Sequence, residues 1–407
     1  MEIFKNLQNL LKFKKSSPYF YTIDVGSDSI KVVLSEIKKD EFSLKIIDSV
    51  KIAQDENAFH NGKILDEASI VASLKEAIKN LNIKHPLKVT NCVFSVSAPN
   101  SRTIMSTLKV NRSSKAVINE EEHSEIMHKL LDTAYSSLSQ FIYEENLQES
   151  PSVEMIDAQP VYITCDGRPV LDLEGEDGSE VELCYSVSFA DSGFLESISN
   201  ISKKLGLEII AVIPASVAIL NSLKKGKKEK LDGVILNIGA SSTEAVVCFG
   251  GGIYLNKSLS IGGADITKAL SKQLKVPYIN AEKIKRLYSL GKLNDKDSAI
   301  VQKVILDILN FWLAGVEELF KNFSGVKAFA PEFYLVGGGS DLPDIKEQLF
   351  EEPWTKSIPF KSNPEFKKID VTKLKELELT EDVKASEDLI PLLTAYHYFM
   401  SKGMKNE

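Results

Sequence analysis

Cysteine and histidine are both scarce in this chain, which has four cysteines and five histidines among 407 residues. The cysteines (Cys92, Cys165, Cys184 and Cys248) are far apart and form no CxxC pair, so their spacing is not that of a zinc site. Three of the four lie in apolar runs, which favours buried, reduced thiols. No Ser–His–Asp or Cys–His arrangement is readable, so the sequence does not indicate nucleophilic catalysis of that kind.

The sequence also lacks a recognisable secretory signal and any run of eighteen apolar residues. We therefore expect a cytoplasmic protein without a membrane-spanning helix. Basic residues are outnumbered, because 49 Lys and Arg face 57 Asp and Glu, for a formal net charge of −8. This balance argues against nucleic-acid binding, which usually needs a basic face. A hydrophobic content of 43% is typical of a globular protein.

The chain opens with a basic amphipathic segment at residues 1–17. Its apolar residues recur at helical spacing, and four lysines outweigh the single Glu2. Pro18 ends the predicted helix. Such a helix can lie on an anionic membrane surface through residues 1–15, which would place the protein on the inner face of the cell membrane. A helix packed on its own domain, or a frayed terminus, is the alternative.

Strands and helices alternate along the rest of the chain, with a change of character in the middle. The first part predicts a strand–turn–strand unit at 19–36, a strand at 43–53, a helix at 68–82 and a strand at 88–97. Residues 98–189 predict an inserted α+β module with a helix at 119–138, strands at 155–164, 168–172 and 180–189, and a polar loop at 140–152. The pattern resumes with a helix at 192–205, a strand at 207–213, a helix at 214–224 and a charged linker at 224–230.

The opening pattern returns at residue 233. Aligning TIDVGSDSIKVVL with ILNIGASSTEAVV places Asp24 opposite Asn237, 213 residues later. This pseudo-repeat predicts two similar half-molecules. The second half predicts helices at 264–274, 279–289, 297–323, 341–350 and 386–401, a strand at 332–336, and a charged, irregular stretch at 351–385.

Both halves of the pseudo-repeat carry the chemistry of a phosphate-binding turn. Glycine lets the backbone approach a phosphate, and exposed N–H groups and small hydroxyls then cradle the anion. The first hairpin offers Asp24, Gly26, Ser27, Ser29 and Lys31, and the second offers Asn237, Gly239, Ser241, Ser242 and Thr243. Either hairpin alone is more simply a tight turn, whereas the pair at equivalent places favours a clamp around one triphosphate.

Two further elements could complete a nucleotide site. In FYLVGGGSDLPDI a strand runs into Gly337, Gly338, Gly339 and Ser340, where a flat base could lie against the backbone. In AEKIKRLYSLG, Glu282 and Lys285 lie on one helical face and could reach a ribose. Alone, these elements are a tight turn and a solvated helix.

Taken in order, DVGSDSIKV, ILNIGASSTEAVV, SIGGADITKALSKQL, AEKIKRLYSLG and YLVGGGSDLPDI resemble the motifs of the actin-like ATPase superfamily. The FtsA and PilM branch is most similar, because its inserted strand–helix–strand–strand (SHS2) domain resembles the module at 98–189. The resemblance implies a two-lobed α/β fold of duplicated ribonuclease-H-like domains. It also implies that ATP and Mg²⁺ bind in the cleft, with Gly262 and Gly263 joining the cofactor site and Asp24 holding the metal. The implied limits are 19–97 and 190–228 for the first domain, 229–268 and 326–407 for the second, and 269–325 for a helical subdomain.

The resemblance implies a filament-forming adaptor rather than a metabolic enzyme. An FtsA-like protein would self-assemble and link FtsZ division filaments to the membrane, and the inserted module and chain length favour this hypothesis. A PilM-like protein would be a scaffold of a type IV pilus or secretion machine that binds a PilN-like tail. The N-terminal helix and the ending MSKGMKNE, without a membrane helix, favour this alternative.

Enzymatic activity is expected to be weak at most. Asn237 stands where the second phosphate motif usually has aspartate, although Glu244 stands near the terminal acidic position of that motif. An amide cannot supply the charge that orders Mg²⁺ and its waters, so ATP binding can survive while hydrolysis weakens. A sugar-kinase-like phosphotransferase is a third hypothesis, but it needs a carboxylate base that no sugar-kinase-like context supplies.

Overall fold

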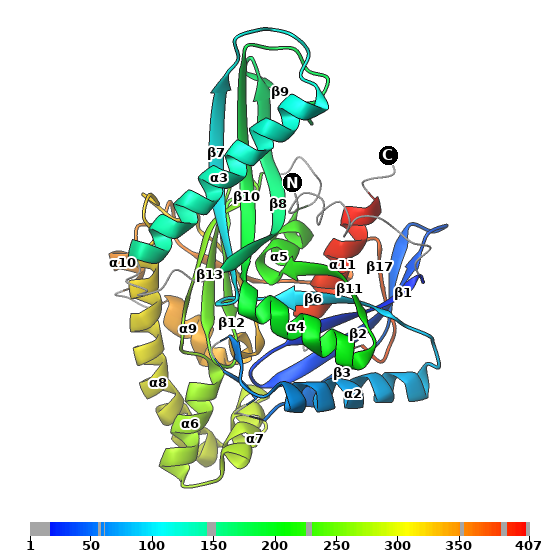
Figure 1. Cartoon of the computed structure of the whole chain (residues 1–407). Helices are drawn as coiled ribbons and strands as arrows, with labels where there is room; N and C mark the ends of the chain where they lie inside the picture. Colours follow the sequence, from blue (N-terminus) through cyan, green and yellow to red (C-terminus); the bar gives the residue numbers. More distant parts are fainter. Residues whose placement is uncertain are drawn as a thin grey trace.

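The computed structural model describes residues 17–55, 58–60, 62–144, 152–224, 230–350, 354–383 and 389–403. Two sheets divide the described chain into two lobes, and the inserted module projects from between them (Figure 1). This is the predicted two-lobed α/β architecture. The predicted N-terminal helix, most of the 224–230 linker and part of the 140–152 loop lie outside the described residues.

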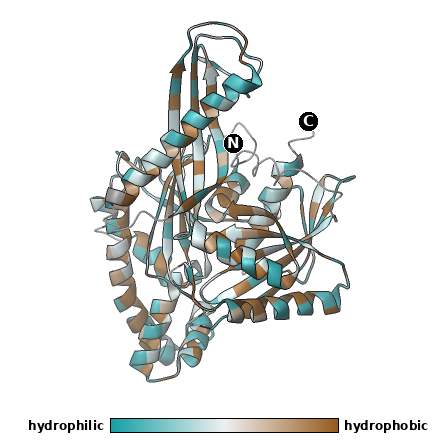
Figure 2. Cartoon of the chain, in the orientation of Figure 1, coloured by the Kyte–Doolittle hydropathy of each residue, from teal (hydrophilic) through white to brown (hydrophobic). Residues whose placement is uncertain are grey.

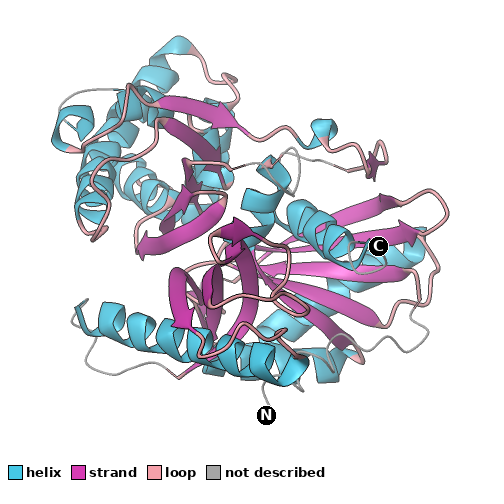
Figure 3. Cartoon of the chain, turned by 90° about the horizontal axis from the view of Figure 1, so that it is seen from above, coloured by secondary structure: helices cyan, strands magenta, loops and turns pink. Residues whose placement is uncertain are grey.

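The first lobe is built on a six-stranded sheet with the order β11-β6-β1-β2-β3-β17. Its strands are β1 Tyr19–Val25, β2 Ser29–Lys38, β3 Ser43–Ala53, β6 Asn91–Val96, β11 Glu208–Pro214 and β17 Leu377–Leu379. Alternate side chains face opposite sides of a strand, so Ile23 and Phe20 enter different cores. Helices α2 Glu67–Lys84 and α4 Ser192–Leu205 cover the Ile23 side, whereas α5 Ala215–Leu223 and α11 Leu389–Gly403 cover the Phe20 side (Figure 1). Seen from above, helices lie against the strands of the sheets (Figure 3).

The second lobe and the inserted module share a nine-stranded sheet with the order β16-β15-β12-β13-β14-β7-β10-β8-β9. The strands of the lobe are β12 Gly233–Ile238, β13 Thr243–Phe249, β14 Gly252–Leu259, β15 Glu332–Val336 and β16 Glu365–Lys368. Those of the module are β7 Ser101–Asn111, β8 Val153–Cys165, β9 Arg168–Pro169 and β10 Glu180–Asp191, covered by α3 Glu120–Glu144. The lobe also holds α6 Gly263–Leu274, α7 Tyr278–Ser289, α8 Asp295–Lys321, η1 Gly338–Asp341, α9 Pro343–Phe350 and α10 Trp354–Ser357. Short elements complete the chain: β4 Phe59–His60, β5 Lys63–Ile64 and η2 Val371–Lys373.

Most predicted elements form within a few residues of their expected bounds, and all four cysteines are buried and free, as predicted. The predicted loop at 140–152 is wrong at its start, because α3 continues to Glu144. Leu138 and Ile142 lie one helical turn apart and both are buried, so they extend the apolar stripe of α3. The strand expected at 168–172 shortens to β9. The sequence interpretation did not identify β7 or β14. The expected irregular stretch at 351–385 is wrong in part, because it contains β16 and β17, which pair with β15 and β3.

The C-terminal part of the chain departs from the expected domain limits. The resemblance implies that residues 326–407 belong to the second lobe, but β17 pairs with β3 in the first-lobe sheet. Helix α11 also packs on that sheet, where Tyr398 contacts Phe20 with ring centroids 5.2 Å apart. The chain therefore crosses back to the first lobe after β16, and this crossing ties the two lobes together.

Helix α8 is long and apolar enough to cross a membrane by length and composition, although the sequence has no uninterrupted run of eighteen apolar residues (Figure 2). Of its most apolar eighteen residues, 28% are buried inside the protein. One face of α8 packs into the second-lobe core through residues such as Ile305, Leu309 and Trp312. Core helices of soluble proteins can meet the same criteria, so length and composition are weak support for a span.

Candidate functional site

The two predicted phosphate hairpins have the same backbone geometry. In the first, Asp24 is paired with Lys31, and the Gly26 N–H donates to the Ser29 carbonyl oxygen at 3.1 Å. In the second, Asn237 is paired with Glu244, and the Gly239 N–H donates to the Ser242 carbonyl oxygen at 2.9 Å. A Cβ on either glycine would press on the carbonyl oxygen that closes its turn. The pseudo-repeat read from the sequence is therefore a repeat of structure.

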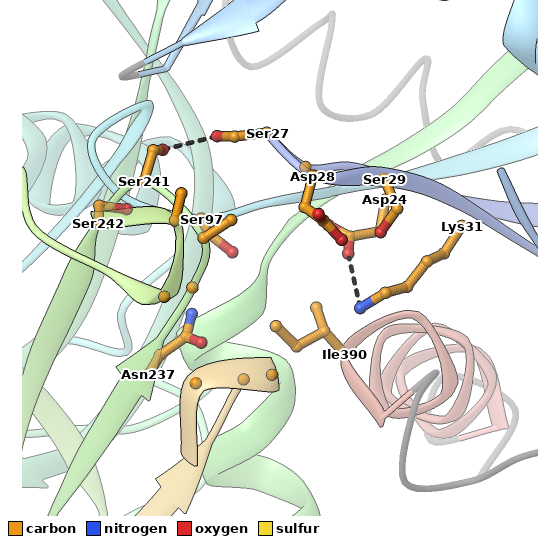
Figure 4. A pocket seen from close by; sticks show the side chains of 18 of the residues that line it. Asp24, Ser27, Asp28, Ser29, Lys31, Ser97, Asn237, Ser241, Ser242 and Ile390 are labelled. Carbon is orange, nitrogen blue, oxygen red and sulfur yellow. Dashed lines mark hydrogen bonds and ion pairs between the residues drawn. The ribbon is translucent and has the colours of Figure 1, made fainter. Parts of the chain in front are cut away.

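The tips of the hairpins meet across one cavity between the lobes. Ser27 Oγ and Ser241 Oγ are hydrogen-bonded at 2.6 Å (Figure 4). At the mouth of the cavity, Arg286 Nη2 of α7 lies 3.5 Å from Asp28 Oδ2 of the first hairpin. The cavity has a volume of about 380 Å³, within the range of small-molecule sites. These cross-lobe contacts enclose a ligand space that both halves of the chain line.

Fifteen of the eighteen residues predicted for the cofactor site line this cavity. They are Asp24, Gly26, Ser27, Ser29, Lys31, Asn237, Gly239, Ser241, Ser242, Gly263, Glu282, Lys285, Gly337, Gly338 and Gly339. The other three, Gly262, Thr243 and Ser340, have structural positions beside it. A Cβ on Gly262 would collide with the Gly239 and Ala240 carbonyl oxygens, so this glycine lets α6 dock on the second hairpin.

Thr243 is fully buried and points away from the cavity. Its hydroxyl donates to the Ile261 carbonyl oxygen at 2.8 Å and accepts from Trp312 Nε1 at 2.9 Å. Thr243 therefore fixes β13 against α8. Ser340 Oγ donates to the Gly337 carbonyl oxygen at 2.7 Å and so stabilises the glycine turn.

The cavity contains fixed charges of both signs. Asp24 Oδ2 lies 3.8 Å from Lys31 Nζ on the first hairpin. On α7, Lys285 Nζ lies 2.7 Å from Glu282 Oε2 and donates to the Gly263 carbonyl oxygen of α6 at 2.8 Å. Burial opposes ionisation of Glu282, but Lys285 and further hydrogen bonds hold the pKa of Glu282 at about 2. Glu282 is thus ionised, and its ion pair with Lys285 is held between α6 and α7.

Asn237 and Glu244 lie side by side on the floor of the cavity. Asn237 Nδ2 donates to Glu244 Oε2 at 3.4 Å, and burial raises the pKa of Glu244. Asn237 Oδ1 is shielded from solvent and has no hydrogen-bond partner among the described residues. Leaving a buried acceptor unsatisfied costs on the order of 1–3 kcal/mol. In this arrangement the donor side of the Asn237 amide is used by Glu244, and its acceptor side is unused by the described residues.

The glycine turn after β15 faces this floor. Gly337 has a left-handed φ of 84°, and a Cβ there would overlap the Ile238 carbonyl oxygen. A Cβ on Gly339 would overlap the Ile238 side chain, whereas a Cβ on Gly338 would meet nothing within 4 Å. The first and third glycines thus allow close backbone packing, and Gly338 leaves open space for a ligand.

The sequence interpretation missed several residues that line the cavity. Ser97 and Asn100 follow β6, which is the parallel neighbour of β1 and ends at the same edge of the sheet. The position of these residues at the end of a predicted strand was a usable signal, because the carboxyl ends of parallel strands form ligand sites in α/β folds. Ile390 of α11 also reaches the cavity, and no local signal in the sequence indicates it (Figure 4).

A divalent cation would have to share its coordination with a ligand. The described residues contain no cluster of three or more His, Cys, Asp or Glu side chains placed to hold a metal. Magnesium is commonly held by one or two carboxylates together with phosphate oxygens and waters. Asp24 lines the cavity and fits the role of such a carboxylate.

Comparisons with known proteins agree with this geometry. A family model described as "Cell division protein FtsA" matches residues 234–366. FtsA of Staphylococcus epidermidis (strain RP62A) is 22% identical over 359 residues, which cover 81% of this chain and 72% of that protein. FtsA of Helicobacter pylori (strain 26695) is 22% identical over 65% of this chain, and the match spans about half (55%) of that relative's length.

Among solved structures, the PilM–PilN type IV pilus biogenesis complex superposes with a TM-score of 0.60. It is 16% identical in sequence, and the match covers 93% of this chain and 97% of that one. At this identity, the superposition is informative about the fold alone. The family model and the FtsA relatives support the resemblance of this chain to the FtsA and PilM branch of the actin-like ATPase superfamily, and the superposition supports the actin-like fold.

Proposed function

We propose that the protein is an ATP-binding, self-assembling adaptor of the FtsA type that links division filaments to the membrane. The ATP site is proposed from one observation: the tips of two equivalent hairpins meet across one cavity. Each tip presents backbone N–H groups and serine hydroxyls, which are suited to phosphate oxygens. The glycine turn at Gly337–Gly339 lies on the same cavity and would receive the base.

The remaining cavity residues suit the other parts of ATP. Glu282 and Lys285 would contact the ribose. Asp24 would hold Mg²⁺ together with the phosphates. Because Asn237 carries no charge, we expect ATP to bind with at most slow hydrolysis.

The division role is proposed from the FtsA family model and the curated FtsA relatives. The partner would be the tail of an FtsZ-like filament. We further propose that residues 1–15 hold the otherwise cytoplasmic protein at the inner face of the membrane. The resulting assembly would be a peripheral layer that self-associates through the actin-like lobes.

A PilM-type scaffold is the alternative function, and the superposition on the PilM–PilN complex favours it. In that case the partner would be a PilN-like cytoplasmic tail at a type IV pilus or secretion machine. The actin-like fold and the ATP site are common to both hypotheses, so the partner distinguishes them.

Partner binding by the full chain tests the choice. The protein, with Mg-ATP, is titrated against fluorescent peptides of the FtsZ C-terminal tail and of a PilN-like N-terminal tail from the same organism, and anisotropy is measured. Saturable binding of the FtsZ tail alone supports the division adaptor, whereas binding of the PilN-like tail alone moves the protein to the pilus scaffold. Binding of neither peptide would contradict both assignments.

A further inference from the structure

The inserted module joins the second lobe where β14 meets β7, and the Asn256 side chain makes part of this joint. The ladder pair between the two strands is Leu255 with Ile104. Beside it, Asn256 Nδ2 donates to the Ser101 carbonyl oxygen at 3.0 Å, and Asn256 Oδ1 accepts from the Thr103 N–H at 2.6 Å. The side-chain amide thus extends the strand pairing by a donor and an acceptor.

The same amide also reaches the floor of the cavity. Asn256 Nδ2 donates to Glu244 Oε1 at 2.7 Å, and Glu244 Oε2 accepts from Asn237 Nδ2 at 3.4 Å. All three side chains are more than nine-tenths buried. A continuous set of hydrogen bonds therefore runs from the cavity to the first strand of the inserted module.

In this set, a phosphate ligand would compete with Glu244 for the amide donor of Asn237. In the structure, Asn237 gives its amide donor to Glu244, while its Oδ1 has no partner among the described residues. A phosphate oxygen needs a donor, so an anion near Asn237 draws its Nδ2 away from Glu244. When the Asn237 amide turns, its Oδ1 faces Glu244, and two acceptors form no hydrogen bond, so Glu244 must take up a proton or turn as well. Either response changes the bond from Glu244 Oε1 to Asn256.

We propose that Asn256 couples occupancy of the nucleotide cavity to the seating of the inserted module. The ligand is the nucleotide of the proposed function, on which this inference rests. Binding of an anionic phosphate shifts Asn237 and Glu244, and Asn256 passes the shift to β7 through Ser101 and Thr103. By linkage, a partner that changes the seating of the module changes the nucleotide affinity by the same factor.

Hydrogen–deuterium exchange of the full chain tests the coupling, with and without Mg²⁺ and a non-hydrolysable ATP analogue. In the wild type we expect the nucleotide to change exchange in β7 and β10 by about fivefold or more, as typical coupling energies imply. Asn256→Ala should still bind the analogue, which calorimetry measures, but should lose the response of β7 and β10.

Ser186→Ala is the matched control at the same joint. Ser186 Oγ donates to the Ile253 carbonyl oxygen at 3.1 Å and accepts from the Ile253 N–H at 2.8 Å, and neither bond runs to the cavity. This variant should keep the response to nucleotide. If Asn256→Ala does not fold, Asn256→Asp replaces it, because the isosteric carboxylate can still accept from Thr103 but cannot donate to Glu244 or Ser101.

The outcomes separate the two proposals. If calorimetry shows that the wild type does not bind the analogue, the proposed nucleotide function fails and the coupling falls with it. If the analogue binds but β7 and β10 do not respond, only the coupling is refuted. A folded Asn256 variant with an undiminished response would also refute it.

Discussion

Replacing Gly338 by aspartate should abolish tight ATP binding without unfolding the protein. Gly338 lines the cavity, has no left-handed φ, and a Cβ there would meet nothing within 4 Å. The new carboxylate therefore fits sterically but places a negative charge in the space proposed for the nucleotide. The base proposed for this space is uncharged, so the penalty comes from covering the new carboxylate without giving it hydrogen-bond partners, which costs about 1–3 kcal/mol or more for a charged group. A penalty of about 2–3 kcal/mol weakens binding roughly 30- to 150-fold.

Isothermal titration calorimetry with Mg-ATP measures this change, and thermal unfolding checks that the variant is folded. Gly338→Ala is the control, because a methyl group in open space should alter the Kd by less than about threefold, or under 1 kcal/mol. Gly339→Ala should instead lower stability, as its Cβ would overlap the Ile238 side chain. An unchanged Kd for folded Gly338→Asp would refute the assignment of this turn to the nucleotide.

Three further predictions concern residues around the cavity and in the first-lobe core. Thr243→Val should lower the free energy of unfolding by about 1–3 kcal/mol, because it leaves Trp312 Nε1 without its acceptor. The Kd for ATP should change little. A large loss of affinity in a folded variant would instead make Thr243 a ligand contact. Arg286→Ala should speed nucleotide dissociation up to about fivefold in stopped-flow measurements. An exposed ion pair such as Arg286–Asp28 stabilises the closed cleft by at most about 1 kcal/mol. An unchanged off-rate would mean that this pair does not restrain the cleft. Burial, with a smaller effect of a nearby lysine, lowers the pKa of His397 from 6.5 to about 4. Between these pH values the unfolded chain binds a proton at His397 and the folded protein does not, so the free energy of unfolding decreases as the pH falls from about 6.5 towards 4. His397→Gln should lack this part of the pH dependence in chemical denaturation, and identical profiles for the two proteins would contradict it.

Local chemistry determined much of what the sequence predicted correctly. Each phosphate hairpin is specified within eight residues, because the turn glycine and the flanking apolar strands fix its register. The same local patterns located the glycine turn and the ends of α4 and β15. These features could be read without knowing the rest of the fold.

Local sequence patterns did not determine which side chains near the cavity point into it. Ser242 and Thr243 are neighbours of similar chemistry, yet Ser242 lines the cavity and Thr243 is bonded to Trp312 of α8. Successive side chains at the start of a strand point to opposite faces, and the face that meets the ligand depends on where α8 packs. The sequence interpretation therefore included Thr243 with the cavity residues.

Only the tertiary structure brought together the contacts that link distant segments. Arg286 reaches Asp28 across the cleft, and α11 delivers Ile390 to the cavity after the chain has returned to the first lobe. Asn256 joins Glu244 to β7 for the same reason: three segments converge on one buried point. Such contacts depend on the packing of whole lobes. Local sequence sets the conformation of each segment, and burial of the shared cores sets which segments meet.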